Sequence, residues 1–239
     1  MQIKGSTVLI TGANRGIGAE FVRQLKARGA GRIYATARNA DSMPFRGGSG
    51  GVEVLELDIT EDDQIAAVAA LAVDVDLLIN NAGVASGADL LTGDLEVIRR
   101  EFEINFFGAL KMTRAFAPVL GANGGGAVLN VLSAAAWFSA PGATSYAASK
   151  AAAWSLTDAT RVQLAAQGTK VLGLHMALVD TDMTAGVDAP KTHPADVVAA
   201  ALDGIEQSRT EVLADPITVG LKSGLHLDPA ARYGTLPTP

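Results

Sequence analysis

The stretch Thr7-Val-Leu-Ile-Thr-Gly-Ala-Asn-Arg-Gly-Ile-Gly18 decides how this chain is expected to fold. Residues 7–11 are apolar or β-branched, which predicts a buried strand. Glycines follow at positions 12, 16 and 18, and an apolar helical pattern then continues to about residue 29. A strand, a glycine turn and a helix in this order place backbone N–H groups where they can bind a pyrophosphate.

The three glycines have separate predicted roles. Gly12 permits a tight turn, Gly16 lets a phosphate approach the backbone, and Gly18 lets the helix pack on the sheet. The spacing GxxxGxG is a variant of the usual GxGxxG dinucleotide fingerprint. An ordinary connection between a strand and a helix is the alternative for this segment taken alone.

The end of the second predicted strand indicates which dinucleotide is bound. No Asp or Glu occurs between Gly31 and Asn39, and Arg38 follows the strand. An acid at this place binds a ribose 2′-hydroxyl, whereas an arginine accommodates a 2′-phosphate. Arg38 and Arg15 can both donate bidentate hydrogen bonds to a phosphate. NADP(H) is therefore favoured over NAD(H), with two solvated surface arginines as the alternative.

Composition excludes several functions. The chain has 239 residues, no cysteine, three separated histidines and a net charge of −6. Disulfides and thiolate metal sites are excluded, and no metal site is expected. The acidic charge without a basic cluster argues against nucleic acid as a partner. No signal pattern is present, and no apolar run approaches the ~20 residues that a membrane span needs, so we expect a cytoplasmic protein without a membrane partner.

Strands and helices alternate along the whole chain. Besides residues 7–11, strands are expected near residues 31–36, 52–57, 75–79, 127–132, 170–176 and 211–214, and helices near 16–29, 61–71, 94–120, 145–167 and 194–208. This order predicts an α/β fold with a doubly wound, mostly parallel seven-stranded sheet and helices on both faces. We expect one domain over residues 1–239, in which residues 181–193 form a mobile loop at the substrate site.

Tyr146 and Lys150 form a candidate acid/base pair. They lie four residues apart in a predicted helix and so project from one face. A free tyrosine titrates near pH 10, and a nearby ammonium favours the phenolate and lowers its pKa. The pair is therefore a plausible general acid/base. A chance pairing on a solvated helix face is the alternative.

Together these motifs mean that residues 7 to about 183 closely resemble the short-chain dehydrogenase/reductase family. The glycine turn matches the family's cofactor turn, Asp58 its adenine-contacting acid, and Asn80-Asn81-Ala82-Gly83 its NNAG segment. The residues that fall where the family carries its catalytic tetrad are Asn105, Ser133, Tyr146 and Lys150. The resemblance implies a single-domain Rossmann fold.

The resemblance also implies hydride transfer between a nicotinamide and a carbonyl or alcohol. Ser133 would donate a hydrogen bond to the carbonyl oxygen, and Tyr146 would donate the proton. Lys150 would lower the pKa of the phenol and bind the nicotinamide ribose, while Asn105 would hold a water in a proton relay. Each residue could instead have a purely structural role, such as Asn105 holding a helix bend. The shared order and spacing favour the functional interpretation.

The resemblance implies a set of cofactor contacts, in which Thr181 matches the threonine that binds the carboxamide. The set is Gly12, Asn14, Arg15, Gly16, Ile17, Gly18, Arg38, Asp58, Ile59, Asn81, Ala82, Gly83, Tyr146, Lys150, Val179 and Thr181. One departure stands out, because Met176 and Ala177 occupy the place where the family commonly has Pro-Gly. The seating of the nicotinamide is therefore an open question.

The expected substrate pocket is apolar and follows the strand ends. Its residues are Ser133, Ala134, Phe138, Tyr146, Leu178 and Met183, with Val84, Ala85 and Trp137 beside them. A core or interface role for Trp137 and Phe138 is equally open. We expect a hydrophobic ketone or aldehyde, aromatic ones included, or the matching alcohol. The alternatives are a 3-oxoacyl thioester reductase on the same scaffold and a non-catalytic regulator that senses NADPH.

Two predicted helices indicate self-association. Residues 145–167 are rich in Ala and Ser, which allow another helix to approach closely, and residues 94–120 carry Phe102, Phe106 and Phe107. Family members often pair these helices across a symmetric interface, and closed symmetry is usual for homo-oligomers. We expect a homotetramer, with a dimer as the lesser possibility. The alternative is that the small residues only pack the helix on its own sheet.

Overall fold

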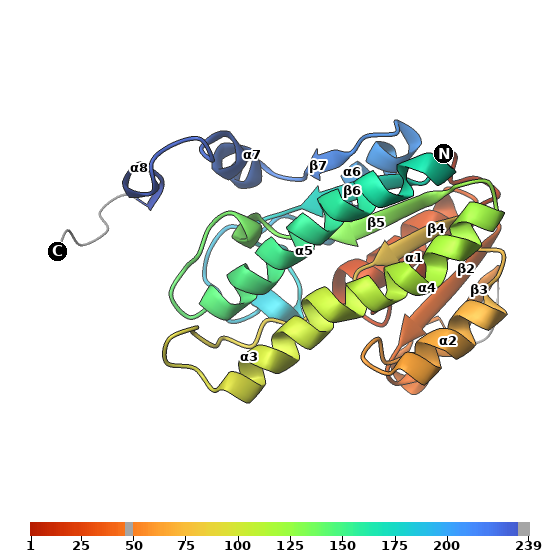
Figure 1. Ribbon diagram of the computed structural model, residues 1–239, viewed down its shortest axis with the longest axis horizontal. Helices are drawn as coiled ribbons and strands as arrows, with labels where there is room; N and C mark the ends of the chain where they lie inside the picture. The colour runs from red at the N-terminus through yellow and green to blue at the C-terminus, as the bar shows by residue number, and fades with distance from the viewer. Residues whose placement is uncertain (46–49, 234–239) are drawn as a thin grey trace.

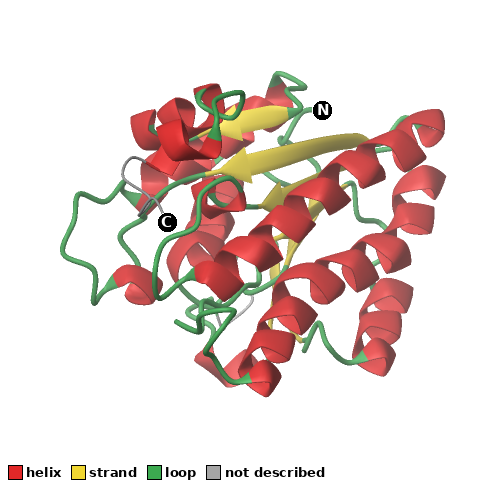
Figure 2. Ribbon diagram, turned by 60° about the vertical axis from the view of Figure 1, so that its left-hand side comes forward, coloured by secondary structure: helices red, strands yellow, loops and turns green. Residues whose placement is uncertain are grey.

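A sheet of seven parallel strands is the centre of the computed structural model, which describes residues 1–45 and 50–233 (Figures 1 and 2). The strands are β1 (Thr7–Ile10), β2 (Arg32–Ala37), β3 (Val52–Glu56), β4 (Leu77–Asn80), β5 (Ala127–Val131), β6 (Lys170–His175) and β7 (Glu211–Leu213). Their order across the sheet is β3-β2-β1-β4-β5-β6-β7. The winding therefore reverses between β1 and β4, and ligands of such sheets bind at the carboxyl ends beside this point.

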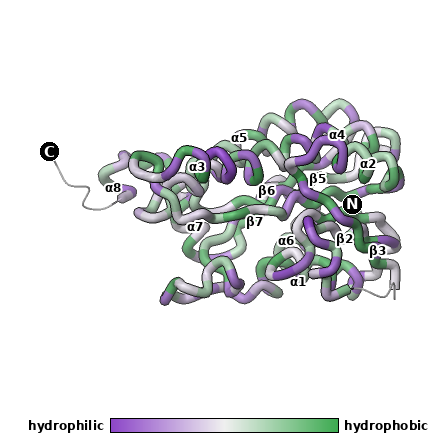
Figure 3. Tube along the Cα trace, turned by 90° about the horizontal axis from the view of Figure 1, so that it is seen from below, coloured by the Kyte–Doolittle hydropathy of each residue, from purple (hydrophilic) through white to green (hydrophobic). Residues whose placement is uncertain are grey.

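Helices cover both faces of the sheet (Figure 3). On one face lie α1 (Gly16–Ala27) and α6 (Pro194–Glu206), and on the other lie α2 (Asp62–Leu71), α4 (Ala109–Ala122) and α5 (Thr144–Leu164). Phe21 of α1 and Val197 of α6 belong to one apolar core, whereas Ile65 of α2 and Phe116 of α4 belong to a second. Burial of these two apolar layers is the main force that holds the helices on the sheet.

The doubly wound parallel sheet is confirmed, and the predicted strand bounds differ from the observed ones by one or two residues. The long helix expected over residues 94–120 is interrupted. It consists of α3 (Leu95–Phe102), a π-helical segment (Glu103–Gly108) and α4. π-Helical segments frequently occur at functional sites, and this one contains Asn105.

Two helices were not predicted, α7 (Pro216–Ser223) and α8 (Pro229–Tyr233), which extend away from the sheet (Figure 1). Asp215 caps α7 by accepting a hydrogen bond from the N–H of Thr218 at 2.8 Å. An Asp before a Pro is a helix-start signal, so the sequence did carry an indication of α7. Across the described ranges, no helix has the length and hydrophobicity that a membrane crossing requires.

Candidate active site

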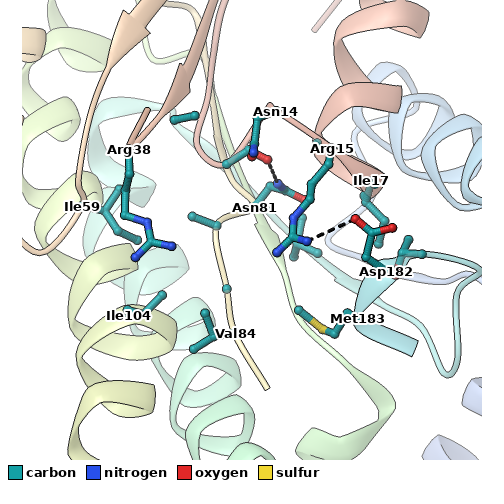
Figure 4. Close-up of a pocket in the computed structure, with 18 of the residues that line it drawn as sticks. Asn14, Arg15, Ile17, Arg38, Ile59, Asn81, Val84, Ile104, Asp182 and Met183 are labelled. Atoms are coloured by element: carbon teal, nitrogen blue, oxygen red, sulfur yellow. Dashed lines mark hydrogen bonds and ion pairs between the residues drawn. The ribbon is translucent and has the colours of Figure 1, made fainter. Parts of the chain in front are cut away.

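A cavity of about 310 Å³ opens at the carboxyl ends of the strands, where the glycine turn, the segment after β4 and the first turns of α5 meet (Figure 4). It lies beside the point where the winding of the sheet reverses. Of the residues predicted to contact a cofactor, all line this cavity except Val179, which is buried. The structure therefore brings the sequence-predicted set together.

The glycine turn adopts a conformation that needs its glycines. Gly12 and Gly16 have φ angles of +66° and +51°, a region that side chains disfavour. A Cβ at Gly12 would lie 2.9 Å from the Cα of Ala82, and one at Gly18 would lie 2.1 Å from the carbonyl oxygen of Gly12. The turn is thus pressed against the segment after β4.

The start of α1 fits the diphosphate of a dinucleotide. Arg15 is the N-cap residue, and within the described part of the chain no side chain caps this end. The first N–H groups of a helix have no intrahelical acceptor and carry the positive end of its dipole. Because Gly16, Ile17 and Gly18 line the cavity, these donors are available to an anion there.

Asn81 fastens the segment after β4 to the glycine turn. Its side-chain amide donates to the carbonyl oxygens of Thr11 at 2.9 Å and Gly12 at 3.0 Å. The Thr11 hydroxyl in turn accepts from the N–H groups of Asn81 and Ala82, both at 3.0 Å. The side chain of Asn81 therefore has a structural role, while its neighbours remain on the cavity wall.

The two candidate phosphate-binding arginines point to different parts of the cavity (Figure 4). Arg38 lies at the end of β2, as expected for a residue that receives a 2′-phosphate. Arg15 instead forms an exposed ion pair with Asp182, with 3.1 Å between Nη1 and Oδ2. Exposed pairs of this kind are weak, so Arg15 can leave Asp182 for a stronger anion.

Asp58 is fixed by its own turn. Its Oδ1 accepts from the N–H of Thr60 at 3.0 Å and from the Thr60 hydroxyl at 2.7 Å. Burial acts to raise the pKa of Asp58, but these hydrogen bonds and the charges of Arg100 and Arg38 lower it overall. A charged carboxylate thus lines the cavity near Arg38.

Tyr146 and Lys150 both reach the cavity from the first turns of α5. Lys150 is buried, and its Nζ donates to the carbonyl oxygen of Val131 at 2.9 Å while lying 5.7 Å from the centre of the Tyr146 ring. Burial lowers the pKa of Lys150 to about 8. The lysine therefore remains mostly protonated at pH 7.

The expected lowering of the tyrosine pKa by Lys150 is wrong for this structure. Burial raises the pKa of Tyr146 to about 12, although a hydrogen bond with the Ser133 side chain acts to lower it. Desolvation of the phenolate, with the negative charge of Glu101 acting in the same direction, outweighs this hydrogen bond. Tyr146 is thus held in its protonated form at neutral pH.

Ser133 and Asn105 stand just behind the cavity wall. The Ser133 hydroxyl accepts from the N–H of Ala135 at 3.1 Å and lies 3.5 Å from the carbonyl oxygen of Met176. The Asn105 amide exchanges two hydrogen bonds of 2.9 Å with the main chain of Val84 and donates to the hydroxyl of Ser149 at 2.9 Å. Asn105 therefore ties the segment after β4 to α5, and its part in a proton relay stays a prediction.

The predicted substrate residues are only partly assembled. Tyr146 and Met183 line the cavity, as does the neighbouring Val84. The other four predicted pocket residues do not line it, namely Ser133, Ala134, Phe138 and Leu178. Phe138 stacks instead on Tyr233 of α8, with ring centres 4.9 Å apart. Trp137 is buried, which favours its core alternative.

Several cavity residues were missed, namely Ala37, Asn39, Ser42, Leu57, Ile104, Val131, Leu132, Met176 and Asp182. Asn39 and Ser42 follow Arg38 directly, so their position after a strand end could have indicated them. The apolar residues carry no local signal, because strand ends that face a cavity and strand ends that face the core have the same composition.

The Met176-Ala177 departure is accommodated by hydrogen bonds. The Met176 carbonyl oxygen accepts from the N–H of Ala134 at 2.8 Å, and the N–H of Ala177 donates to Oδ2 of Asp215 at 2.8 Å. Beyond it, Val179 and Thr192 form a parallel bridge at the two ends of the predicted mobile loop. The mobility of residues 181–193 stays a prediction.

The strand order and the glycine turn are those of a dinucleotide-binding fold, and comparison with known proteins gives the family. The family model for short chain dehydrogenases matches residues 6–192, so the chain belongs to the short-chain dehydrogenase/reductase family. A short chain dehydrogenase from Burkholderia cenocepacia, solved in complex with NADP, is 39% identical and covers 100% of both chains with a TM-score of 0.94.

Curated relatives are more distant. The 7alpha-hydroxysteroid dehydrogenase of Escherichia coli is 32% identical over 80% of this chain and 78% of that protein. The ketoacyl reductase HetN of Nostoc is 30% identical over 92% of this chain and 82% of that protein. An uncharacterized oxidoreductase of Mycobacterium tuberculosis is 32% identical, and the match spans only 57% of its length.

The burial of Lys150 leads to a prediction about stability. Its folded pKa of about 8 lies below the ordinary 10.5, so the unfolded chain binds more protons between these values. The lysine therefore destabilises the fold at pH 7, and this cost disappears as pH rises through that window. Lys150→Met should raise the free energy of unfolding at pH 7 by on the order of 3 kcal/mol.

Thermal unfolding of both proteins at pH 7 and pH 10 measures the difference, which should shrink at pH 10. Lys170→Met serves as the control, because Lys170 is exposed and its replacement should leave the melting temperature unchanged. A Lys150→Met variant that melts at or below the wild-type temperature at pH 7 would contradict this account.

Proposed function

We propose that the protein is an NADP(H)-dependent enzyme that interconverts a hydrophobic ketone or aldehyde and the corresponding alcohol. The observation that carries this proposal is the cavity itself, which the glycine turn, Arg38, Tyr146 and Lys150 line together. Arg38 at the end of β2 and the NADP complex of the Burkholderia relative support the choice of dinucleotide. The apolar side chains of Val84 and Met183 on the cavity wall support a hydrophobic substrate.

In this proposal each residue of the site has a separate role in the reaction. A bound NADPH supplies the hydride. Tyr146 donates its phenolic proton to the carbonyl oxygen, and the Ser133 hydroxyl, already paired with that phenol, donates a hydrogen bond to the same oxygen. The Lys150 ammonium binds the nicotinamide ribose and adds positive charge beside the phenol. At neutral pH the phenol of Tyr146 carries its proton and can donate it in reduction, and in oxidation the same tyrosine would act as the base.

A second candidate is a 3-oxoacyl thioester reductase on the same scaffold. The similarity to the ketoacyl reductase HetN, which extends over most of both chains, favours it. Initial rates on acetoacetyl thioesters and on aryl ketones, each with NADPH and NADH, separate the two candidates. A chain that binds NADPH but turns over none of these carbonyl compounds would instead be the NADPH-sensing regulator, a function with no need for a proton donor.

The proposed acid can be tested directly. Tyr146→Phe removes the phenolic hydroxyl and keeps the ring, so turnover should fall by ~10²-fold or more while NADPH binding survives. Tyr34→Phe is the matched control, because its hydroxyl hydrogen-bonds Asp74 at 2.9 Å away from the cavity. Steady-state rates and NADPH titration measure both effects. Near-normal turnover of Tyr146→Phe would refute the mechanism.

The proposed cofactor preference rests on Arg38. Arg38→Asp would repel a 2′-phosphate and offer an acceptor to a ribose hydroxyl, so the KM for NADPH should rise much more than the KM for NADH. Arg99→Asp changes the charge equally at an exposed position of α3 and should leave the ratio of the two constants unchanged. If Arg38→Asp also left this ratio unchanged, Arg38 would play no part in selecting the cofactor.

We further propose a cytoplasmic homotetramer, with a dimer as the lesser possibility. Phe107 on the π-helical segment and Val162 on α5 are exposed apolar residues on the two helical elements expected to associate. Burying them against a symmetric copy would remove this apolar surface from water. Light scattering at micromolar concentration should give a mass near four times the 24.5 kDa of the chain. A mass of 24.5 kDa would mean a monomer and would contradict the proposal.

A further inference from the structure

His175 is a buried histidine directly beneath the turn that carries Ser133. It is the last residue of β6, has no exposed surface, and is not among the residues assigned a role in the site. Its Nδ1 lies 3.2 Å from the carbonyl oxygen of Ser133. Its ring also stacks on Trp137, with ring centres 4.0 Å apart and planes inclined by 20°. The imidazole thus touches both ends of the short turn from Ser133 to Trp137.

The chemistry of this contact fixes the tautomer of the ring. A carbonyl oxygen only accepts hydrogen bonds, so Nδ1 must carry the proton that Ser133 accepts. Nε2 is then an unprotonated acceptor, and among the described residues it has no hydrogen-bond partner. It faces Gly173 and lies 3.7 Å from Oε1 of Glu211, which is itself an acceptor.

The surroundings keep the ring neutral. Burial lowers the pKa of His175 to about 4, and the Lys222 ammonium, 2.8 Å from Glu211 and 4.6 Å from the Trp137 ring centre, opposes protonation further. A histidine that leaves one nitrogen buried without a partner costs stability, since an unmet buried acceptor is unfavourable. An aliphatic residue would avoid that cost. The hydrogen bond from Nδ1 to the Ser133 carbonyl oxygen is therefore the feature that a histidine adds at this position.

We propose that His175 is a positioning residue for the reaction, and that its Nδ1–H holds the main chain of Ser133 so that the serine hydroxyl faces Tyr146 and the substrate carbonyl. This inference rests on the proposed function for its kinetic effect. Ser133 is extended, with φ −161° and ψ 156°, and begins a single short turn. Within that turn its carbonyl oxygen accepts from the N–H of Ala136 at 3.1 Å, and the imidazole of His175 is its contact from outside the turn. The Met176 carbonyl oxygen accepts from the N–H of Ala134 at 2.8 Å, and His175 donates to the carbonyl oxygen of the same Ser133–Ala134 peptide group from its other side.

The experiment is a double-mutant cycle on kcat between His175 and Ser133. His175→Phe keeps a ring that can stack on Trp137 but removes the donor, so kcat should fall about 10-fold with the affinity for NADPH unchanged. In a Ser133→Ala background the same replacement should change kcat by less than about 2-fold, because the hydroxyl that it positions is absent. His175→Asn, which can present an amide N–H near the place of Nδ1, should recover part of the loss.

Trp154→Leu is the matched control. Trp154 packs edge-on against Trp137 at 5.7 Å and belongs to the same aromatic cluster, but it makes no contact with Ser133 among the interactions of the described residues. It should lower the melting temperature and leave kcat unchanged. The inference would be overturned if His175→Phe lowered kcat equally in the wild-type and Ser133→Ala backgrounds. It would also be overturned if His175→Phe left kcat unchanged with Ser133 present.

If the wild-type protein reduces no carbonyl compound, the proposed function is refuted but the inference about His175 is not. A measurement that needs no turnover then tests the inference. The chain has only three histidines, so ¹⁵N-resolved NMR can assign each ring. His175 should be the neutral Nδ1–H tautomer at pH 7, whereas His193, whose Nδ1 accepts from the N–H of Ala195 at 3.1 Å, should carry its proton on Nε2. An Nε2–H tautomer at His175 would overturn the inference whatever the activity.

Discussion

The structure depends on the hydrogen bonds by which Asn81 joins the ends of β1 and β4. The two strands are paired as far as Ile10 and Ile79, but the chain leaves them toward opposite faces of the sheet, which opens a crevice at their carboxyl ends. The Asn81 amide lies at the base of this crevice, and the Thr11 hydroxyl accepts two hydrogen bonds from the segment after β4. The glycine turn therefore has a fixed shape. The start of α1 is then aimed into a cavity of defined width.

The site places Tyr146 and Lys150 in surroundings that oppose their charge. Burial raises the pKa of Tyr146 and lowers that of Lys150, so the same desolvation favours a neutral phenol and disfavours the ammonium. The Val131 carbonyl oxygen is one of the few groups that compensate the lysine charge within the fold. Burial of the lysine lowers stability, while the same low dielectric strengthens any hydrogen bond that the two side chains make in the cavity.

The sequence was sufficient for the sheet and for most of the residues that line the cavity. Glycine spacing and β-branched runs are local signals, and they correctly predicted β1, the turn and α1. The direction of Arg15 was not predictable, because Asp182 is distant in the sequence and meets it only in the folded chain. The stacking of Phe138 on Tyr233 was missed for the same reason. The raised pKa of Tyr146 also depends on burial, which a helical spacing of four residues does not reveal.

The end of β6 shows how a departure from a family pattern can be absorbed by residues elsewhere. Where Pro-Gly is common, this chain has Met176 and Ala177, so the backbone there needs other restraints. Asp215 supplies one by accepting from the N–H of Ala177, and the same carboxylate accepts from the Thr218 hydroxyl at 2.8 Å as α7 begins. The helix after β7 is thereby connected to the segment that carries Thr181 and Met183 into the cavity. A change in α7 can therefore move the segment that lines this end of the cavity without touching the cavity itself, which makes α7 part of the framework of the cavity.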